Sequence, residues 1–156
     1  MSQDDFQAAL APIVDHLRGL DPADPSARTT LQERFPIGGP ELTALAALFE
    51  SGVSDGWLCD RKGSETVSYS RVRKAGDGEL SIDAVRMSGP GPGHTHPNGE
   101  FDLCFSVDGS PTFDGQPVGW VVYPPDSWHV PTVAGGTMNI LYFLPGGAIE
   151  FGPKPS

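Results

Sequence analysis

Hydrophobic residues recur along the chain with two different periods, one before and one after about residue 56. In the first part they are three and four residues apart, the spacing that places them on one face of an α-helix. After residue 56, short runs rich in Val, Ile, Thr and aromatic residues are separated by Gly, Pro and Asp, which is typical of β-strands joined by turns. The pattern predicts a helical N-terminal extension over residues 1–55 and a β-barrel over residues 56–156, together forming one structural domain.

Three helices are expected in the first part. The first covers residues 4–20 and ends where two Asp-Pro pairs follow, because the residue before a proline is biased away from the helical conformation. The second covers residues 26–35. The third covers residues 40–50, with Pro40 in its first turn and Gly52 as its C-terminal cap.

Seven short strands are expected in the second part. Their number and spacing predict an antiparallel sandwich or a small barrel, so that the protein is mainly β. The expected strands cover residues 65–73, 79–87, 94–96, 101–107, 119–123, 128–132 and 137–144.

Composition limits the possible partners and the cellular location. The chain of 156 residues carries 20 Asp and Glu against 10 Lys and Arg, a formal net charge of −10, which opposes binding to nucleic acid and to anionic membranes. It shows no secretory signal pattern and no apolar run approaching the roughly 20 residues that span a bilayer. With Cys59 and Cys104 expected to be free thiols, we predict a cytoplasmic protein with no nucleic-acid or membrane partner.

The stretch from residue 91 to 100, GPGHTHPNGE, carries the candidate chemistry. In a strand, side chains two residues apart point to the same face, so His94 and His96 can reach one ion. The following Pro-Asn-Gly turn would swing Glu100 back toward the two rings. His129 follows the proline turn of YPPDSWH and is a fourth candidate. The stretch predicts a metal site, and a polar loop is the simpler alternative.

The spacing of these residues resembles the two metal-binding motifs of the cupin superfamily, His-x-His-x3-Glu and, some thirty residues later, Pro-x4-His. The resemblance implies an antiparallel β-barrel of the jelly-roll type. It also implies that a divalent metal ion is held by three histidines and one glutamate, namely His94, His96, Glu100 and His129.

Three positions depart from the usual cupin motifs. Asp126 stands where the second motif has glycine, Val133 stands where it has asparagine, and the glycine that closes the first motif is displaced to Gly109. The ligand residues are unchanged, so these departures bear on the geometry of the turn around His129 and not on the ligand set.

Three longer segments resemble the hydroxylaminobenzoate lyase family: GHTHPNGEFDL, GWVVYPPDSWHVPTVAGG and ILYFLPGGAIEF. Members of that family take part in bacterial nitroaromatic breakdown and convert 4-hydroxylaminobenzoate to 3,4-dihydroxybenzoate and ammonia. The resemblance implies a metal-dependent lyase with a small aromatic substrate.

Three neutral imidazoles and one carboxylate would leave a divalent ion with a net charge of about +1 and with open positions for water or substrate. Iron, manganese, zinc and nickel all suit this ligand set. We assign catalytic roles to His96 and Glu100, with Glu100 either bound to the ion or transferring a proton.

A carboxylate on the substrate would need a cationic partner from outside the candidate site, because residues 87–153 contain no Lys or Arg. A guanidinium group matches a carboxylate in bidentate fashion. The candidates are Arg71, Arg73 and Arg86, for each of which plain surface exposure is the alternative. Tyr123 and Trp128 are candidates for stacking on an aromatic ring, with a role in the core as the alternative.

Side-chain parity predicts which residues surround the site. Asp102, Cys104 and Ser106 share strand parity with Glu100 and would line the cavity if Glu100 faces it. The other side of the expected strand would carry Phe101, Leu103 and Phe105. For Cys104, the role of a small buried hydrophobic residue is the preferred interpretation.

Two other functions fit the same residues. One is a nonhaem dioxygenase of a small aromatic or thiol substrate, because the same ligand set supports O₂ chemistry in other cupins. The other is a cupin that binds a small molecule without catalysis. A homodimer is expected, since the exposed strand edges of a small barrel gain by pairing with a neighbour. The alternative is that the helical segment caps one end of the barrel.

Overall fold

A computed structural model describes residues 2–76 and 79–155. The described chain begins with three helices and continues in strands. The helices are α1 (Gln3–Arg18), α2 (Ala27–Arg34) and α3 (Pro40–Asp55). The strands are β1 (Arg61–Ser64), β2 (Val67–Arg73), β3 (Leu80–Met87), β4 (His94–His96), β5 (Glu100–Phe113), β6 (Gly119–Tyr123), β7 (Ser127–His129), β8 (Val133–Pro145) and β9 (Glu150–Phe151).

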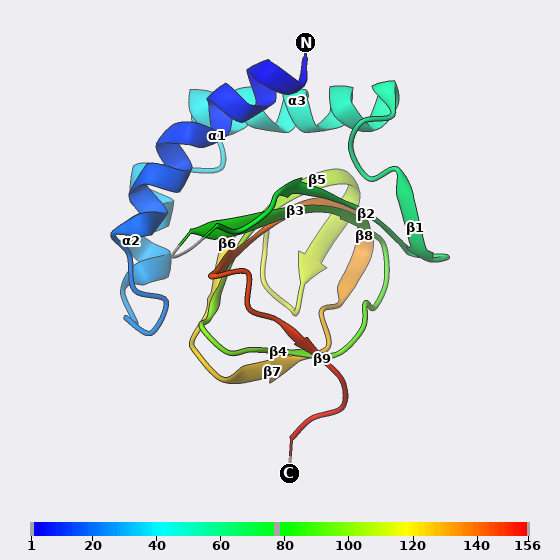
Figure 1. The fold of residues 1–156 in the computed structure, drawn as a ribbon. Coiled ribbons are helices and arrows are strands. Elements are labelled where there is room, and N and C mark those ends of the chain that lie inside the picture. The colour runs from blue at the N-terminus through cyan, green and yellow to red at the C-terminus, as the bar shows by residue number, and fades with distance from the viewer. Residues whose placement is uncertain (1, 77–78, 156) are drawn as a thin grey trace.

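The strands form two antiparallel sheets that face each other (Figure 1). The larger sheet has the order β1-β2-β3-β8-β5-β6, and the smaller has the order β7-β4-β9. Helices α1 and α3 lie over the outer face of the larger sheet, and α2 lies beside β6 (Figure 1). This is a jelly roll of the cupin type with a helical N-terminal part, so the predicted fold class is confirmed. None of the described helices is long and apolar enough to cross a membrane.

The larger sheet separates two hydrophobic cores. Its outer face packs against the helices and contributes Phe101, Leu103 and Phe105 to that core. Its inner face, which carries Cys104, packs in a second core between the two sheets. The alternation expected along β5 is therefore confirmed, and both cysteines are free thiols.

Helix α3 is joined to the sheet by polar contacts as well as apolar ones. The carboxylate of Glu50 accepts hydrogen bonds from Arg86 Nη1 of β3 (3.0 Å) and from Asn139 Nδ2 of β8 (2.8 Å). Asn139 is buried, so this contact satisfies its amide nitrogen, which would otherwise be costly to bury beneath the helix.

Two strands were not predicted, and two others are longer than expected. Strand β1 has the polar sequence RKGS with all four residues exposed, and β9 has only two residues. Strands β5 and β8 have 14 and 13 residues because their pairing continues through register shifts near Gly109 and Gly136. Backbone pairing requires no hydrophobic side chains, so a search for apolar runs finds none of these features.

The prediction that Gly52 caps α3 was wrong. The helix continues to Asp55 and is capped by Gly56, which has a left-handed backbone (φ 83°). Gly52 is buried inside the helix, where a Cβ atom would lie 2.7 Å from Leu58 Cδ1 and 2.8 Å from Trp57 Cζ3. This glycine is needed for close packing rather than for its conformational freedom.

Replacement of Gly52 by alanine is expected to destabilise the fold by about 1–3 kcal/mol, because the added methyl group overpacks the contact with Leu58. Urea unfolding followed by circular dichroism measures the change. Gly38→Ala is the matched control, since nothing lies within 4 Å of a Cβ at that position, and it is expected to change stability by less than about 0.5 kcal/mol. Equal stabilities of the two variants would contradict the packing argument.

Candidate metal centre

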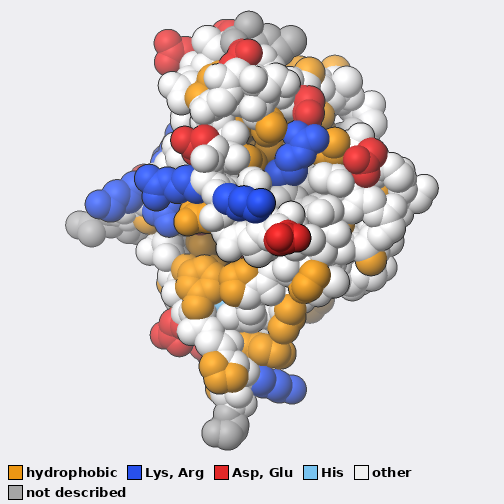
Figure 2. Space-filling model, turned by 90° about the vertical axis from the view of Figure 1, so that its right-hand side faces the viewer, with side chains coloured by type: hydrophobic (Ala, Val, Ile, Leu, Met, Phe, Trp, Pro, Cys, Tyr) orange, Lys and Arg blue, Asp and Glu red, His pale blue; other side chains and the backbone are white. Residues whose placement is uncertain are grey.

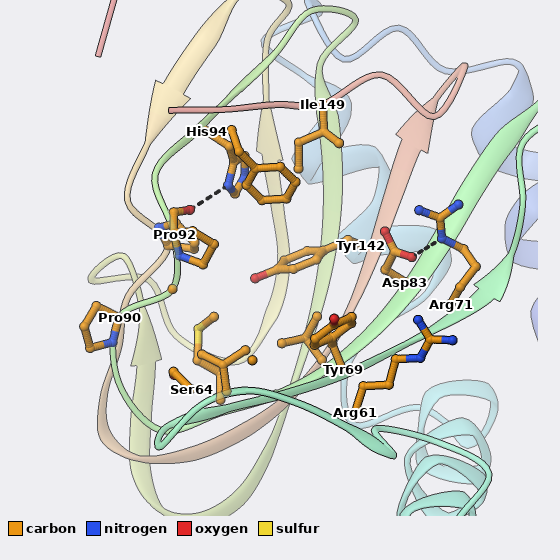
Figure 3. Close-up of a pocket in the computed structure, with 17 residues that line it drawn as sticks. Arg61, Ser64, Tyr69, Arg71, Asp83, Pro90, Pro92, His94, Tyr142 and Ile149 are labelled. Carbon is orange, nitrogen blue, oxygen red and sulfur yellow. Dashed lines mark hydrogen bonds and ion pairs between the residues drawn. The ribbon is translucent and has the colours of Figure 1, made fainter. Parts of the chain in front are cut away.

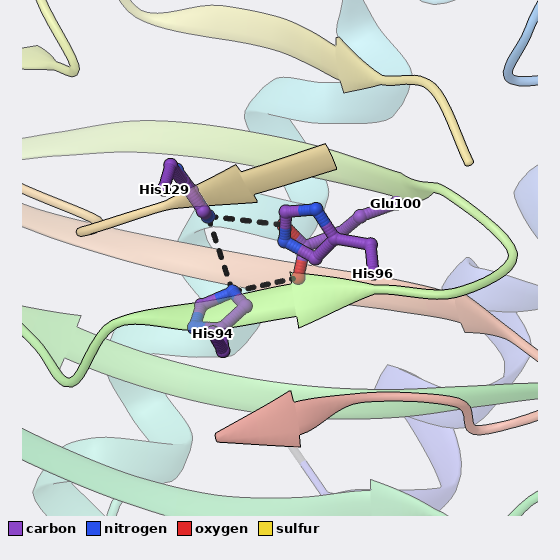
Figure 4. Close-up of side chains that lie close together, drawn as sticks. All are labelled: His94, His96, Glu100 and His129. Carbon is purple, nitrogen blue, oxygen red and sulfur yellow. Dashed lines mark hydrogen bonds and ion pairs between the residues drawn. The ribbon is translucent and has the colours of Figure 1, made fainter. Parts of the chain in front are cut away.

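Strand pairing brings the four predicted ligand residues together between the two sheets (Figure 4). Strand β4 supplies His94 and His96, β7 ends at His129, and β5 begins at Glu100. Because β4 and β7 are antiparallel, His94 and His129 are directly paired. Glu100 belongs to the larger sheet, where it pairs with Tyr123 of β6, so the cluster joins both sheets.

The turn between β4 and β5 requires a glycine. Gly99 N donates a hydrogen bond to His96 O (3.2 Å), and Gly99 has φ 85°. A Cβ at this position would lie 2.6 Å from Pro22 Cγ and 2.9 Å from Tyr123 O. The Pro-Asn-Gly turn thus returns the chain and places Glu100 beside the two histidines, as the sequence predicted.

The turn before His129 keeps a glycine-like backbone without a glycine. Asp126 has φ 64°, a left-handed conformation that aspartate tolerates better than most residues. Its N–H donates to His96 O (2.7 Å). The departure from the cupin motif at this position therefore preserves the connection between β7 and β4.

Four side-chain atoms converge in the space between the sheets. One ligand atom from each of the four residues lies within 4.8 Å of all the others. His94 Nε2 lies 3.1 Å from His129 Nε2, and His96 Nε2 lies 2.9 Å from Glu100 Oε2. Two atoms bound to one ion at about 2.1 Å are separated by about 3 Å, so the spacing suits a shared ion.

In two of the histidines, the hydrogen-bond partner of Nδ1 can only accept, which determines which ring nitrogen carries the proton. His94 Nδ1 lies 3.0 Å from Pro92 O, and His129 Nδ1 lies 2.6 Å from Asp114 Oδ2. A carbonyl and an ionised carboxylate only accept hydrogen bonds, so Nδ1 is the protonated nitrogen in both rings. Burial lowers the pKa of His94, which favours its neutral form with a lone pair on Nε2.

The third histidine is oriented through a hydroxyl group. His96 Nδ1 lies 2.9 Å from Ser127 Oγ, and this hydroxyl donates its own proton to Pro124 O (2.6 Å). Ser127 Oγ must therefore accept from His96 Nδ1–H. In its neutral form, each of the three rings directs an Nε2 lone pair into the cluster.

The converging atoms have no hydrogen-bond donor between them. His96 Nε2 and both carboxylate oxygens of Glu100 are buried without a hydrogen-bond partner among the described residues. Facing lone pairs and a buried carboxylate repel one another unless a cation lies between them. The donor set therefore fits a divalent metal ion, with imidazole nitrogen and carboxylate oxygen as its ligands.

Asp114 supports the cluster and was not singled out from the sequence. Besides His129 Nδ1–H, it accepts hydrogen bonds from the Tyr123 hydroxyl and from Thr132 N (2.8 Å). Burial acts to raise the pKa of Asp114, but these hydrogen bonds outweigh it and the pKa is lowered. The Asp114-Gly115 pair predicts a turn, yet nothing in the sequence links that turn to a histidine fifteen residues later.

A cavity of about 810 Å³ borders the cluster at His94 (Figure 3). Its lining includes Tyr142 of β8 and Arg71 of β2. The buried carboxyl of Asp102 and the hydroxyl of Tyr142 lie on the inner face without a hydrogen-bond partner among the described residues. Burial, together with the nearby carboxylate of Glu100, raises the pKa of Asp102 well above its usual range.

Of the arginines and aromatic residues expected to contact a substrate, only some lie at the cavity. Arg71 lines the cavity, whereas Arg73, Tyr123 and Trp128 are not among its lining residues. Tyr123 stacks on the His96 ring with centroids 5.3 Å apart, and Trp128 Nε1 donates to Gly152 O (2.9 Å). Arg86 binds Glu50 of α3.

Two facing antiparallel sheets with three histidines and one glutamate between them define a cupin with a cluster that could hold a metal ion. The profile of the family described as PnbB, 4-hydroxylaminobenzoate lyase, matches residues 8–151. The chain belongs to this family and is an enzyme of the lyase class.

Two relatives carry the name 4-hydroxylaminobenzoate lyase. The protein from Nocardioides sp. (strain LMS-CY) is 30% identical over 137 residues, covering 80% of this chain and 80% of its own. The protein from Pseudomonas putida is 28% identical over 141 residues, covering 78% and 80%. Among solved structures, an RmlC-like cupin protein from Ralstonia eutropha JMP134 is 15% identical with a TM-score of 0.43, covering 60% of this chain and 72% of that chain.

Replacement of Asp114 by asparagine is expected to lower the affinity for Zn²⁺ by about 10- to 100-fold, because the His129 ring loses the anion that orients it. Competition with a chromogenic chelator measures the affinity. Asp126→Asn is the matched control: Asp126 also has a left-handed backbone, but its side chain makes no hydrogen bond among the described residues. Unchanged affinity in Asp114→Asn would show that His129 is oriented by other contacts.

Proposed function

We propose that this protein is a metal-dependent lyase that converts 4-hydroxylaminobenzoate to 3,4-dihydroxybenzoate and ammonia. Membership of the family supports the reaction class. The observation that carries the metal dependence is the convergence of three Nε2 atoms and the Glu100 carboxylate beside a cavity.

The reaction consumes one water molecule and needs no external oxidant. The N–O bond of the hydroxylamino group breaks, and a C–O bond forms at the neighbouring ring carbon. Water then adds to the resulting carbon–nitrogen double bond, and ammonia leaves, so that a carbonyl group remains. Transfer of the hydrogen from the hydroxylated ring carbon to the carbonyl oxygen restores the aromatic ring. The chemistry that the protein must supply is polarisation of the N–O bond, proton transfer and orientation of the ring.

His94, His96, His129 and Glu100 would hold the ion, which would supply Lewis-acid polarisation as iron, manganese, zinc or nickel. The ring of His96 is held between Ser127 and Tyr123, so its Nε2 is well oriented.

Glu100 has a second role in this proposal. Its Oε2 faces His96 Nε2 at 2.9 Å and His129 Nε2 at 3.8 Å, while its Oε1 lies 3.9 Å from His94 Nε2. One oxygen can therefore serve as a ligand while the other accepts a proton from the hydroxylamino group.

The cavity suits an aromatic acid. Its lining contains Val85, Met87 and Tyr142, which offer apolar contact to a ring and exclude water from it. Arg71, one of the arginines expected to bind a carboxylate, also faces this space. The sequence further predicts a cytoplasmic homodimer that binds neither nucleic acid nor membrane, and these stay predictions.

Replacement of His96 by alanine is expected to remove the bound metal and to lower ammonia release by at least about a hundredfold, because one ligand and its orientation are lost. Metal content of untagged protein is measured by inductively coupled plasma mass spectrometry, and ammonia release from 4-hydroxylaminobenzoate is measured without oxygen. His16→Gln is the control, since His16 lies on α1 outside the cluster.

The outcomes separate the proposed lyase from its alternatives. Stoichiometric metal with oxygen-independent ammonia release supports the lyase. Metal together with oxygen consumption would indicate a dioxygenase, and ligand binding without turnover would indicate a binding protein. Full turnover by His96→Ala would refute the metal mechanism.

A further inference from the structure

We infer that Arg61 and Arg71 form a carboxylate-binding end of the cavity, which selects benzoates whose reacting group is para to the carboxylate. The inference rests on the proposed function for the reacting group. The anion site itself depends only on the residues that line the cavity. Arg61 belongs to β1, the polar strand that the hydrophobic pattern did not reveal.

Strand register places the two arginines on the same face. Arg61 pairs with Tyr69 across β1 and β2, and Arg71 lies two residues beyond Tyr69 on β2. Side chains of paired residues share a face, as do those two apart in one strand. All three residues line the cavity, whereas Lys62, the neighbour of Arg61, is not part of its lining.

The two guanidinium groups differ in their hydrogen-bond partners. Arg71 Nε donates a hydrogen bond to Asp83 Oδ1, while its two terminal nitrogens have no hydrogen-bond acceptor among the described residues. Arg61 makes neither a salt bridge nor a side-chain hydrogen bond within that part of the chain. Asp83 offsets the charge of Arg71, so Arg61 contributes the uncompensated positive charge at this end.

Basic residues are concentrated around this end of the cavity. Five of the ten Lys and Arg residues of the chain lie between residues 61 and 74. Figure 2 shows Lys and Arg side chains gathered above a hydrophobic area on the face that carries β1. In a protein with a net charge of −10, such a local patch attracts an anionic substrate to one entrance.

The cavity has chemically different ends. His94, the one candidate ligand that lines it, lies across the cavity from Arg61 and Arg71 (Figure 3). The ring of Tyr142 projects into the same space (Figure 3). A rigid benzoate with its carboxylate at the arginines can direct a para substituent toward His94. In a benzoate bound the same way, an ortho substituent lies next to the carboxylate, and therefore beside the arginines and away from His94.

Arg61→Gln is expected to weaken binding of 4-hydroxybenzoate by about 10- to 100-fold, because a charge-assisted contact is lost. Isothermal titration calorimetry measures the affinity of the metal-loaded protein. Phenol lacks the carboxylate and is expected to bind wild type and variant within about twofold of each other. In wild type, 2-hydroxybenzoate is expected to bind at least about tenfold more weakly than 4-hydroxybenzoate.

Matched variants separate local contact from general charge. Lys62→Gln removes one positive charge from the same strand and is expected to change affinity by less than about threefold. Arg71→Gln combined with Asp83→Asn removes the ion pair without leaving Asp83 unpaired, and it is expected to weaken 4-hydroxybenzoate binding by about tenfold. Thermal midpoints confirm that each variant is folded.

Turnover gives an independent readout. For 4-hydroxylaminobenzoate, Arg61→Gln is expected to raise KM by about 10- to 100-fold with kcat changed by less than about threefold, as for lost uniform binding. Equal affinity of wild type and Arg61→Gln for 4-hydroxybenzoate would overturn the inference even if the lyase activity is present. Arginine-dependent binding of 4-hydroxybenzoate without any turnover would support the anion site and refute the proposed reaction.

Discussion

Three imidazoles that in their neutral form direct their lone pairs at one buried carboxylate form the constraint on which the centre depends. Each ring needs an acceptor for its Nδ1 proton, and these come from three separate places: Pro92 O, Ser127 Oγ and Asp114. The result is a group of electron donors that repel one another without a cation. Metal binding would therefore be coupled to the stability of this region, because an ion would supply the attraction that the side chains lack.

The two faces of the larger sheet have different roles: the outer face contributes to stability, and the inner face carries the candidate site. The outer face of the larger sheet is filled by helices α1 and α3 with large apolar residues, which form the more extensive core. The inner face accommodates the cluster, a cavity and the polar groups of Asp102 and Tyr142, which have no hydrogen-bond partner in the part of the chain that the structure describes. Burial of such groups is costly, and the packing of the helices offsets that cost on the opposite side of the same strands.

Positive charge is unevenly distributed over the protein. The chain is acidic, yet four of its ten Lys and Arg residues lie on β1 and β2, and two of these four, Arg61 and Arg71, line the cavity. Asp83 orients Arg71 through Nε and leaves its terminal nitrogens available. Arg61, without a partner of its own in the described structure, retains the positive charge that an anionic ligand needs.

The sequence by itself determined the helical faces, the alternation along β5 and the identity of the four clustered residues. These features depend on spacing within a short segment, such as the interval of two between His94 and His96 and the glycine turn before Glu100. Once a strand is recognised, such spacing determines which side chains share a face.

Only the tertiary structure decided the roles of Asp114, Gly52 and Arg61. Asp114 reaches His129 through the hairpin between β5 and β6, Gly52 makes room for Leu58, and Arg61 lies in a strand with no apolar residue. Their roles depend on which segments pair and in what register, and a shift of one residue would turn each strand side chain to the opposite face. Local patterns therefore identified the atoms that could bind a metal, while long-range pairing decided which arginines face the same cavity.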